Sequence, residues 1–103
     1  AAEANNRKAS ADDAKAQNYL NQVRARAFGN SSQASSSTGA TLTREIWDER
    51  NFELAMEGHR FFDLVRTGEA SSKISGFISG KHEVFPIPQT EIDISGLTQN
   101  AGY

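Results

Sequence analysis

The chain has 103 residues, of which 11 are basic and 13 acidic, and its formal net charge is −2. This near balance argues against a nucleic-acid-binding domain, which normally carries a concentrated basic surface. The absence of cysteine excludes disulfides, thiolate metal sites and cysteine nucleophiles. No stretch approaches the 18 consecutive apolar residues of a membrane-spanning helix. Length and composition thus fit one small domain.

Large apolar residues are unevenly distributed along the chain. Of the 24 Val, Ile, Leu, Met, Phe, Trp and Tyr residues, only four precede Leu42. The first 41 residues therefore cannot build a hydrophobic core by themselves. We interpret the chain as a piece of a larger protein and expect it to pack against the remainder of that protein.

Residues 10–28 predict an amphipathic helix. Ser10 with Asp13 resembles a capping box, and Gly29 is a natural helix stop. Apolar residues recur at i, i+4, i+7 and i+11 along one face: Ala16, Leu20, Val23 and Ala27. The Ser/Gly-rich residues 29–41 that follow predict a flexible surface loop.

Residues 42–56 predict a second helix that is apolar on two sides. One face contains Leu42, Ile46, Glu49, Arg50, Glu53, Met56 and Glu57, and the other contains Trp47 and Leu54. A helix with two apolar faces is expected to be buried on both. Gly58 then marks a bend or a stop, and residues 59–67 predict a short helix that Gly68 closes.

From Glu69 onward the helical period is lost. Residues 74–80 are ambiguous between a loop and a short strand, and residues 82–93 predict an extended segment because of Pro86 and Pro88. Pro88 is expected to begin a single helical turn. The last residues predict an irregular tail, pinned to a core by Ile92, Ile94, Leu97 and Tyr103.

Charged residues alternate in sign between positions 50 and 66. The set comprises Arg50, Glu53, Glu57, Arg60, Asp63 and Arg66. On an exposed helix each such pair contributes only ~0.2–0.5 kcal/mol. We therefore expect these groups to lie partly buried where two helices meet and to fix the angle between them. Arginine suits this structural role because its planar fork can serve two carboxylates.

A catalytic or metal site is the alternative interpretation of this segment. Glu53, Glu57 and His59 lack the Glu-x-x-His or His-x-x-x-His spacing of metal-binding helices. Two carboxylates on neighbouring turns of a buried helix do not face each other across a sugar, as in a glycosidase. His59 and His82 are expected to be surface or hydrogen-bonded residues. Trp47 is either a sugar-stacking platform or a core residue, and Leu54 one heptad later favours the core. We expect no catalytic residue, no metal and no cofactor.

Three motifs, in order along the chain, resemble the SusD/RagB family. Residues 47–68, WDERNFELAMEGHRFFDLVRTG, are similar to the family's E-R-x-x-E-x-x-x-E-G-x-R-x-x-D-L-x-R signature, with matches at Glu49, Arg50, Glu53, Glu57, Gly58, Arg60, Asp63, Leu64 and Arg66. Residues 19–28, YLNQVRARAF, resemble the helix that precedes this signature. Residues 81–103 are similar to the family's closing K-x-x-x-x-P-I-P-x-x-E…Q-N-x-G-Y, with matches at Lys81, Pro86, Ile87, Pro88, Glu91, Gln99, Asn100, Gly102 and Tyr103. Ala101 departs from it, since family members often carry proline there.

The resemblance implies a surface-exposed outer-membrane lipoprotein that captures oligosaccharides or other nutrients for a SusC-like, TonB-dependent transporter and catalyses no reaction. It implies an all-α, tetratricopeptide-like superhelix, of which residues 1–103 form the C-terminal part. That part comprises a repeat-type helix region (1–28), a Ser/Gly-rich loop (29–41), signature helices (42–68) and an irregular, extended wrap (69–103). The lipid-attachment cysteine is expected upstream, and no ligand-binding residue is carried over.

Two alternatives stay open. The chain could be a stand-alone helical module that holds a partner peptide. It could also be a carbohydrate-active enzyme that uses Glu53 and Glu57.

Overall fold

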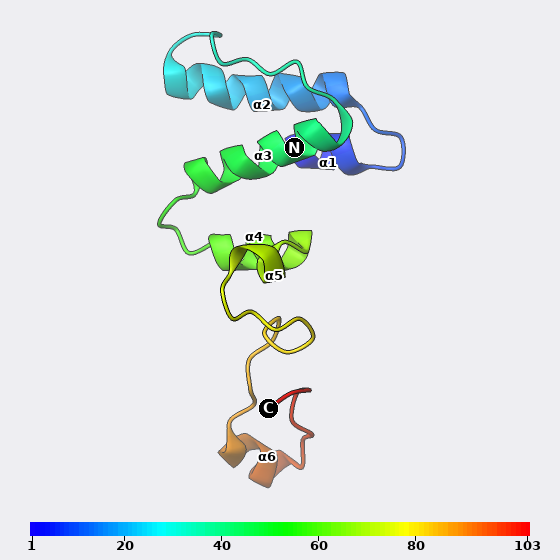
Figure 1. Cartoon of the computed structure of the whole chain (residues 1–103), viewed down its shortest axis with the longest axis vertical. Coiled ribbons are helices and arrows are strands. Elements are labelled where there is room, and N and C mark those ends of the chain that lie inside the picture. The colour runs from blue at the N-terminus through cyan, green and yellow to red at the C-terminus, as the bar shows by residue number, and fades with distance from the viewer. The chain divides into compact units, whose positions relative to one another are not determined.

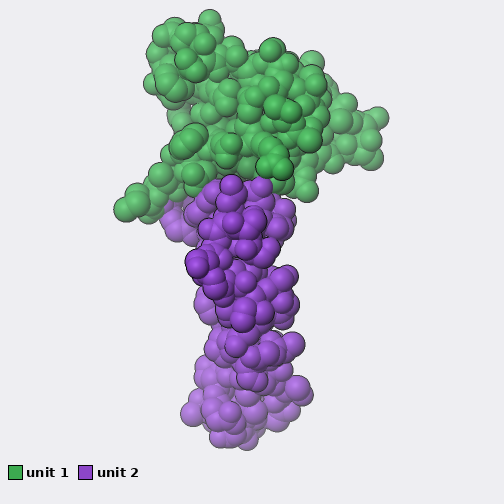
Figure 2. Space-filling view, viewed as in Figure 1, with its two compact units in different colours: residues 1–56 green, residues 57–103 purple.

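A computed structural model describes all residues, 1–103, and contains six helices and no strand (Figure 1). The predicted all-α class is confirmed, and the tetratricopeptide-like arrangement stays a prediction. The chain divides into two compact units, Ala1–Met56 and Glu57–Tyr103, which Figure 2 shows in different colours. None of the six helices combines the length and the apolar character that crossing a bilayer requires.

The first unit contains three helices: α1 (Ala2–Arg7), α2 (Asp13–Phe28) and α3 (Gly39–Glu53). The predicted cap of α2 by Ser10 is wrong, because the Asp12 carboxylate accepts a hydrogen bond from the Lys15 N–H at 3.0 Å and so sets the first turn. The predicted stop is confirmed, since Gly29 lies in the left-handed region with φ of 70°.

Helices α2 and α3 run in the same direction (Figure 1). Polar contacts pair them in one register from start to end: Asp13 with Gly39, Arg24 with Glu49, and Arg26 with Glu53. The segment between them must therefore return along the length of α2. By contrast, α1 runs antiparallel to α3, because Glu3 contacts Trp47 and Asn6 contacts Thr43.

Side chains of α2 hold this returning loop. The Asn21 amide donates to the Ser35 carbonyl at 3.0 Å and accepts from the Ser35 N–H at 2.7 Å, as a neighbouring strand would. Gln17 donates to the Ser37 carbonyl at 2.7 Å. The sequence predicted a flexible loop here. In the structure, hydrogen bonds from polar side chains of α2 hold the loop against the helix, and apolar packing does not.

The core of the first unit is small. It consists of Ala16, Leu20, Leu42 and Ile46, with Ala2 packed against them. Beside it lies Asn6, only 7% exposed. Its amide donates to the Asp13 carboxylate at 2.8 Å and to the Gly39 carbonyl at 3.2 Å, and accepts from the Thr43 hydroxyl at 2.5 Å. One buried side chain thus links all three helices.

Helix α3 ends three residues earlier than the sequence predicted. Its last residue is Glu53, and the Leu54 N–H bonds back to the Arg50 carbonyl at 3.1 Å. Met56 adopts a φ of 69° and is fully exposed. The predicted place of Met56 on the buried face is therefore wrong, because the backbone has already left the helix.

The second unit contains α4 (Arg60–Thr67), α5 (Ala70–Lys73) and α6 (Gln89–Ser95). Leu64 and Ala70 are its buried apolar residues. Gly68 ends α4 as predicted, with φ of 77°, and the Glu69 N–H returns to the Leu64 carbonyl at 2.9 Å. The single turn α5 was not foreseen, and residues 74–80 form bends and turns instead of a strand.

The predicted apolar attachment of the tail is wrong for Ile94 and Leu97, whereas Ile92 is half-buried. Ile94 and Leu97 are 82% and 50% exposed. Hydrogen bonds from Gln99, Asn100 and Tyr103 to the backbone of residues 84–87 hold the tail instead. Helix α6 buries no residue, so the apolar side chains on it have no core to enter.

Leu42→Ala is expected to lower the free energy of unfolding by about 2–5 kcal/mol, because Leu42 is fully buried in a core with few other members. Urea unfolding followed by the fluorescence of Trp47, the single tryptophan, measures the change. Phe52→Ala on the same helix is the control, since Phe52 is 71% exposed and its loss should cost less than about 1 kcal/mol. Equal effects of the two variants would contradict the assignment of the core.

Candidate functional site

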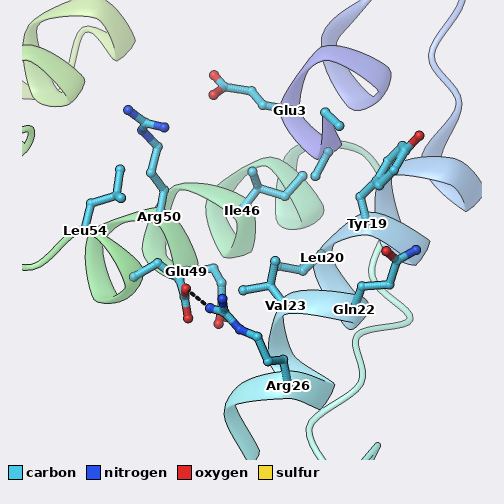
Figure 3. A pocket seen from close by; sticks show the side chains of 13 residues that line it. Glu3, Tyr19, Leu20, Gln22, Val23, Arg26, Ile46, Glu49, Arg50 and Leu54 are labelled. Carbon is cyan, nitrogen blue, oxygen red and sulfur yellow. Dashed lines mark hydrogen bonds and ion pairs between the residues drawn. The ribbon is translucent and has the colours of Figure 1, made fainter.

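The three helices of the first unit enclose a groove with a cavity volume of about 550 Å³ (Figure 3). Its apolar lining comes mainly from Tyr19, Leu20 and Val23 of α2 and from Ile46 of α3. Figure 3 shows Leu20, Val23 and Ile46 between α2 and α3, with the Tyr19 ring extending toward α1. Charged groups from all three helices border it: Glu3, Arg26, Glu49, Arg50 and Glu53. The groove is therefore apolar inside, and both acidic and basic side chains lie along its rim.

Arg24 braces the two longer helices next to this groove. Its Nε lies 2.7 Å from Glu49 Oε2, and its Nη1 lies 3.2 Å from Glu45 Oε2. The three side chains are only 13–28% exposed. One guanidinium thus serves two carboxylates, which is the role that the sequence predicted for the signature arginines. The arginine that fills this role here is Arg24 of α2, which lies outside the signature. Sequence reasoning missed Arg24 and Glu45, although the four-residue spacing of Glu45 and Glu49 beside the apolar face of α3 was a usable signal.

Two carboxyl groups of the first unit have lowered pKa values. Hydrogen bonds from the Ser35 and Ser37 hydroxyls, with a smaller contribution from Arg24, hold the pKa of Glu45 below its usual range. The Gly39 N–H and then the Asn6 amide lower the pKa of Asp13. Both carboxylates are consequently structural acceptors that stay ionised at neutral pH.

The predicted ion-pair residues occupy different surroundings. Glu53 pairs with Arg26 of α2, and Asp63 Oδ1 lies 2.7 Å from Arg66 Nε within α4. Arg50 is half-buried at the groove. Glu57 and Arg60 are exposed. The expected cluster of all six residues stays a prediction.

Trp47 is engaged with α1. Its Nε1–H donates to Glu3 Oε1 at 2.9 Å, and the Arg7 guanidinium lies 5.5 Å from the ring centre. Arg7 also pairs with Glu3 at 2.8 Å. Both the polar edge of the indole and a ring face are thus occupied, which favours the structural interpretation of Trp47 over a sugar platform.

The other residues considered for chemistry lie apart. His59 is exposed and precedes α4 as its cap residue. His82 Nδ1 accepts a hydrogen bond from the Ile78 N–H at 3.0 Å. The structure contains no group of three His, Asp or Glu side chains that could hold a metal ion.

The second unit has a smaller, aromatic hollow of about 340 Å³. It is lined by Phe61, Ile74, Phe77, His82, Val84, Phe85 and Tyr103, with Ser75 and Gly76. The ring centres of Phe61 and Phe77 lie 6.3 Å apart, and those of Phe77 and His82 lie 5.7 Å apart. These contacts join α4 to the turns that follow α5.

A family model described as the SusD family matches residues 1–84. The chain belongs to the SusD family. The match includes all of the first unit and α4 and α5 of the second, whereas α6 and the tail lie beyond it. Searches of curated proteins and of solved structures found no significant match. SusD family membership indicates a nutrient- or glycan-binding protein of the outer membrane.

Arg24→Met is expected to lower the free energy of unfolding by ~1–3 kcal/mol, because it leaves two partly buried carboxylates side by side without their cation. Arg26→Met is the matched control: the Arg26 side chain is 71% exposed, and exposed pairs contribute below ~1 kcal/mol. Urea titrations of both variants measure the difference. A larger loss for Arg26→Met would contradict the bracing role of Arg24.

Stability should fall as the pH falls through the acid range. The folded-state pKa values of Asp13 and Glu45 lie below their unfolded values, so these groups stabilise the fold above the unfolded pKa values. That contribution is lost from about pH 5 down to about pH 2. Urea midpoints measured between pH 7 and pH 3 test this. Glu45→Gln should flatten part of the dependence, and an unchanged pH profile for this variant would contradict the assignment.

Proposed function

We propose that residues 1–103 are the C-terminal part of a SusD-like cell-surface lipoprotein. This protein binds oligosaccharides or other nutrients and delivers them to a SusC-like, TonB-dependent transporter of the outer membrane. Its lipid-bearing cysteine lies upstream of the residues described here. The observation that carries the proposal is the SusD family match over residues 1–84.

The geometry of the signature segment supports a binding protein without catalysis. Glu53, the first carboxylate of the enzymatic alternative, is paired with Arg26, and Glu57 lies outside any helix on an exposed turn. A glycosidase needs two carboxylates that face each other across the sugar. We therefore assign a structural role to the charged signature residues Arg50, Glu53, Glu57, Arg60, Asp63 and Arg66.

The closing motif also has a structural explanation. Gln99, Asn100 and Tyr103 all bond to the backbone of residues 84–87, and the Lys81 ammonium lies 4.6 Å from the centre of the Tyr103 ring. A tail bonded in this way supports the interpretation of residues 69–103 as a wrap that completes the fold. The ligand contacts are expected in the upstream part of the parent protein.

The test uses cells of the bacterium that encodes the chain. An antibody against the loop of residues 29–38 should detect a surface-exposed, protease-accessible protein in the outer membrane, with a mass far above the 11.2 kDa of residues 1–103. Its immunoprecipitate should contain a β-barrel transporter and bind oligosaccharides without cleaving them. An intracellular species of about 11 kDa would contradict the proposal, and glycan cleavage abolished by Glu57→Gln would support the enzymatic alternative.

A further inference from the structure

Residues 97–103 lie against the segment that precedes α6 without being buried in it. Figure 1 shows them, in red, running back from α6 beside residues 84–87. None of the seven residues is fully buried, and Leu97 and Tyr103 are 50% and 45% exposed. We call this segment the strap. Its place depends on directed polar contacts more than on apolar packing.

Every hydrogen bond between the strap and residues 84–87 uses a strap side chain. Gln99 Oε1 accepts from the Ile87 N–H at 2.8 Å, and Gln99 Nε2 donates to the Ile87 carbonyl at 2.9 Å. Asn100 Nδ2 donates to the Phe85 carbonyl at 2.6 Å, and the Tyr103 hydroxyl donates to the Val84 carbonyl at 3.0 Å. Because Pro86 and Pro88 carry no N–H, Ile87 supplies the one amide proton of residues 86–88.

Tyr103 of the strap forms part of the aromatic hollow. Tyr103 lines the hollow together with Phe61, Phe77 and Phe85, and the Lys81 ammonium stacks on its ring at 4.6 Å. Gly102 permits this approach: its φ is 89°, and a Cβ there would lie 3.1 Å from the Lys81 side chain. The strap thus contributes Tyr103 to the wall of the hollow.

We propose that the strap opens and closes over the aromatic hollow while the rest of the second unit stays folded. A segment with no fully buried side chain and only exposed or half-buried hydrogen bonds belongs to the low-stability end of a fold, and it opens locally. The backbone hydrogen bonds that join Glu69 to Leu64 and Ile74 to Ala70 do not involve strap residues. Opening removes Tyr103 from the hollow and frees the Ile87 amide.

Amide hydrogen exchange of the full chain, resolved by NMR, tests the strap, because protection of the Ile87 N–H reports its closed state. Gln99→Ala should lower the protection of Ile87 about tenfold, while the Glu69 amide, which bonds to the Leu64 carbonyl, keeps its protection. Gly102→Ala should also lower the protection of Ile87, because the added Cβ would meet the Lys81 side chain and disfavour the closed strap. Gln89→Ala is the control, since Gln89 bonds only to Asp93 in α6.

Two results would overturn the proposal. Ile87 could exchange at the rate of an unstructured amide in the unaltered chain, which would mean that the strap does not close. Alternatively, Gln99→Ala could lower the protection of Ile87 and Glu69 equally, which would mean that the strap opens only when the whole unit unfolds.

Discussion

The arrangement of the first three helices depends on the buried amide of Asn6. The apolar core beneath it has four principal members, two of them on α2 and two on α3, and α1 adds only Ala2. So little apolar contact fixes neither the register nor the direction of α1. Asn6 sets the register, because its amide bonds to Asp13 at the start of α2 and to Gly39 and Thr43 at the start of α3. Together with the contact between Glu3 and Trp47, it also sets the direction of α1. A buried amide with all these partners specifies one arrangement, since any other leaves it unsatisfied.

The same use of polar groups recurs along the chain. Asn21 bonds to both backbone groups of Ser35, and Gln99 bonds to both backbone groups of Ile87. In each case a side-chain amide takes the part of a neighbouring strand, so an irregular segment has its backbone satisfied without a sheet. These bonds explain how a chain with few buried apolar residues can hold a ten-residue loop and a tail in place.

The groove of the first unit follows from this architecture. Because α2 and α3 run the same way and α1 is short, the apolar faces of the two longer helices are not fully covered near Val23 and Leu54. Arg24 and its two carboxylates hold these helices at the neighbouring surface and keep the groove's spacing. The SusD family match indicates a nutrient- or glycan-binding protein, and in our proposal the signature carboxylates and arginines are structural parts of its scaffold.

The helices α2, α3 and α4 were predictable from their residues because local chemistry fixes them, whereas α5 was not foreseen. The apolar spacing of Ala16 and Leu20, and the glycines at 29 and 68, set the helices and their ends without reference to the remainder of the chain. The resemblance of three motifs to one family was also present in the sequence alone. The match to residues 1–84 confirmed the family and includes the first two of these motifs, whereas most of the closing motif lies beyond it. What the sequence could not give is the partner of each polar side chain. Glu53 meets Arg26, and Trp47 meets Glu3 across 44 positions, because helix directions decide these contacts. Spacing along a chain determines which residues share a face, whereas only the folded structure determines which faces meet.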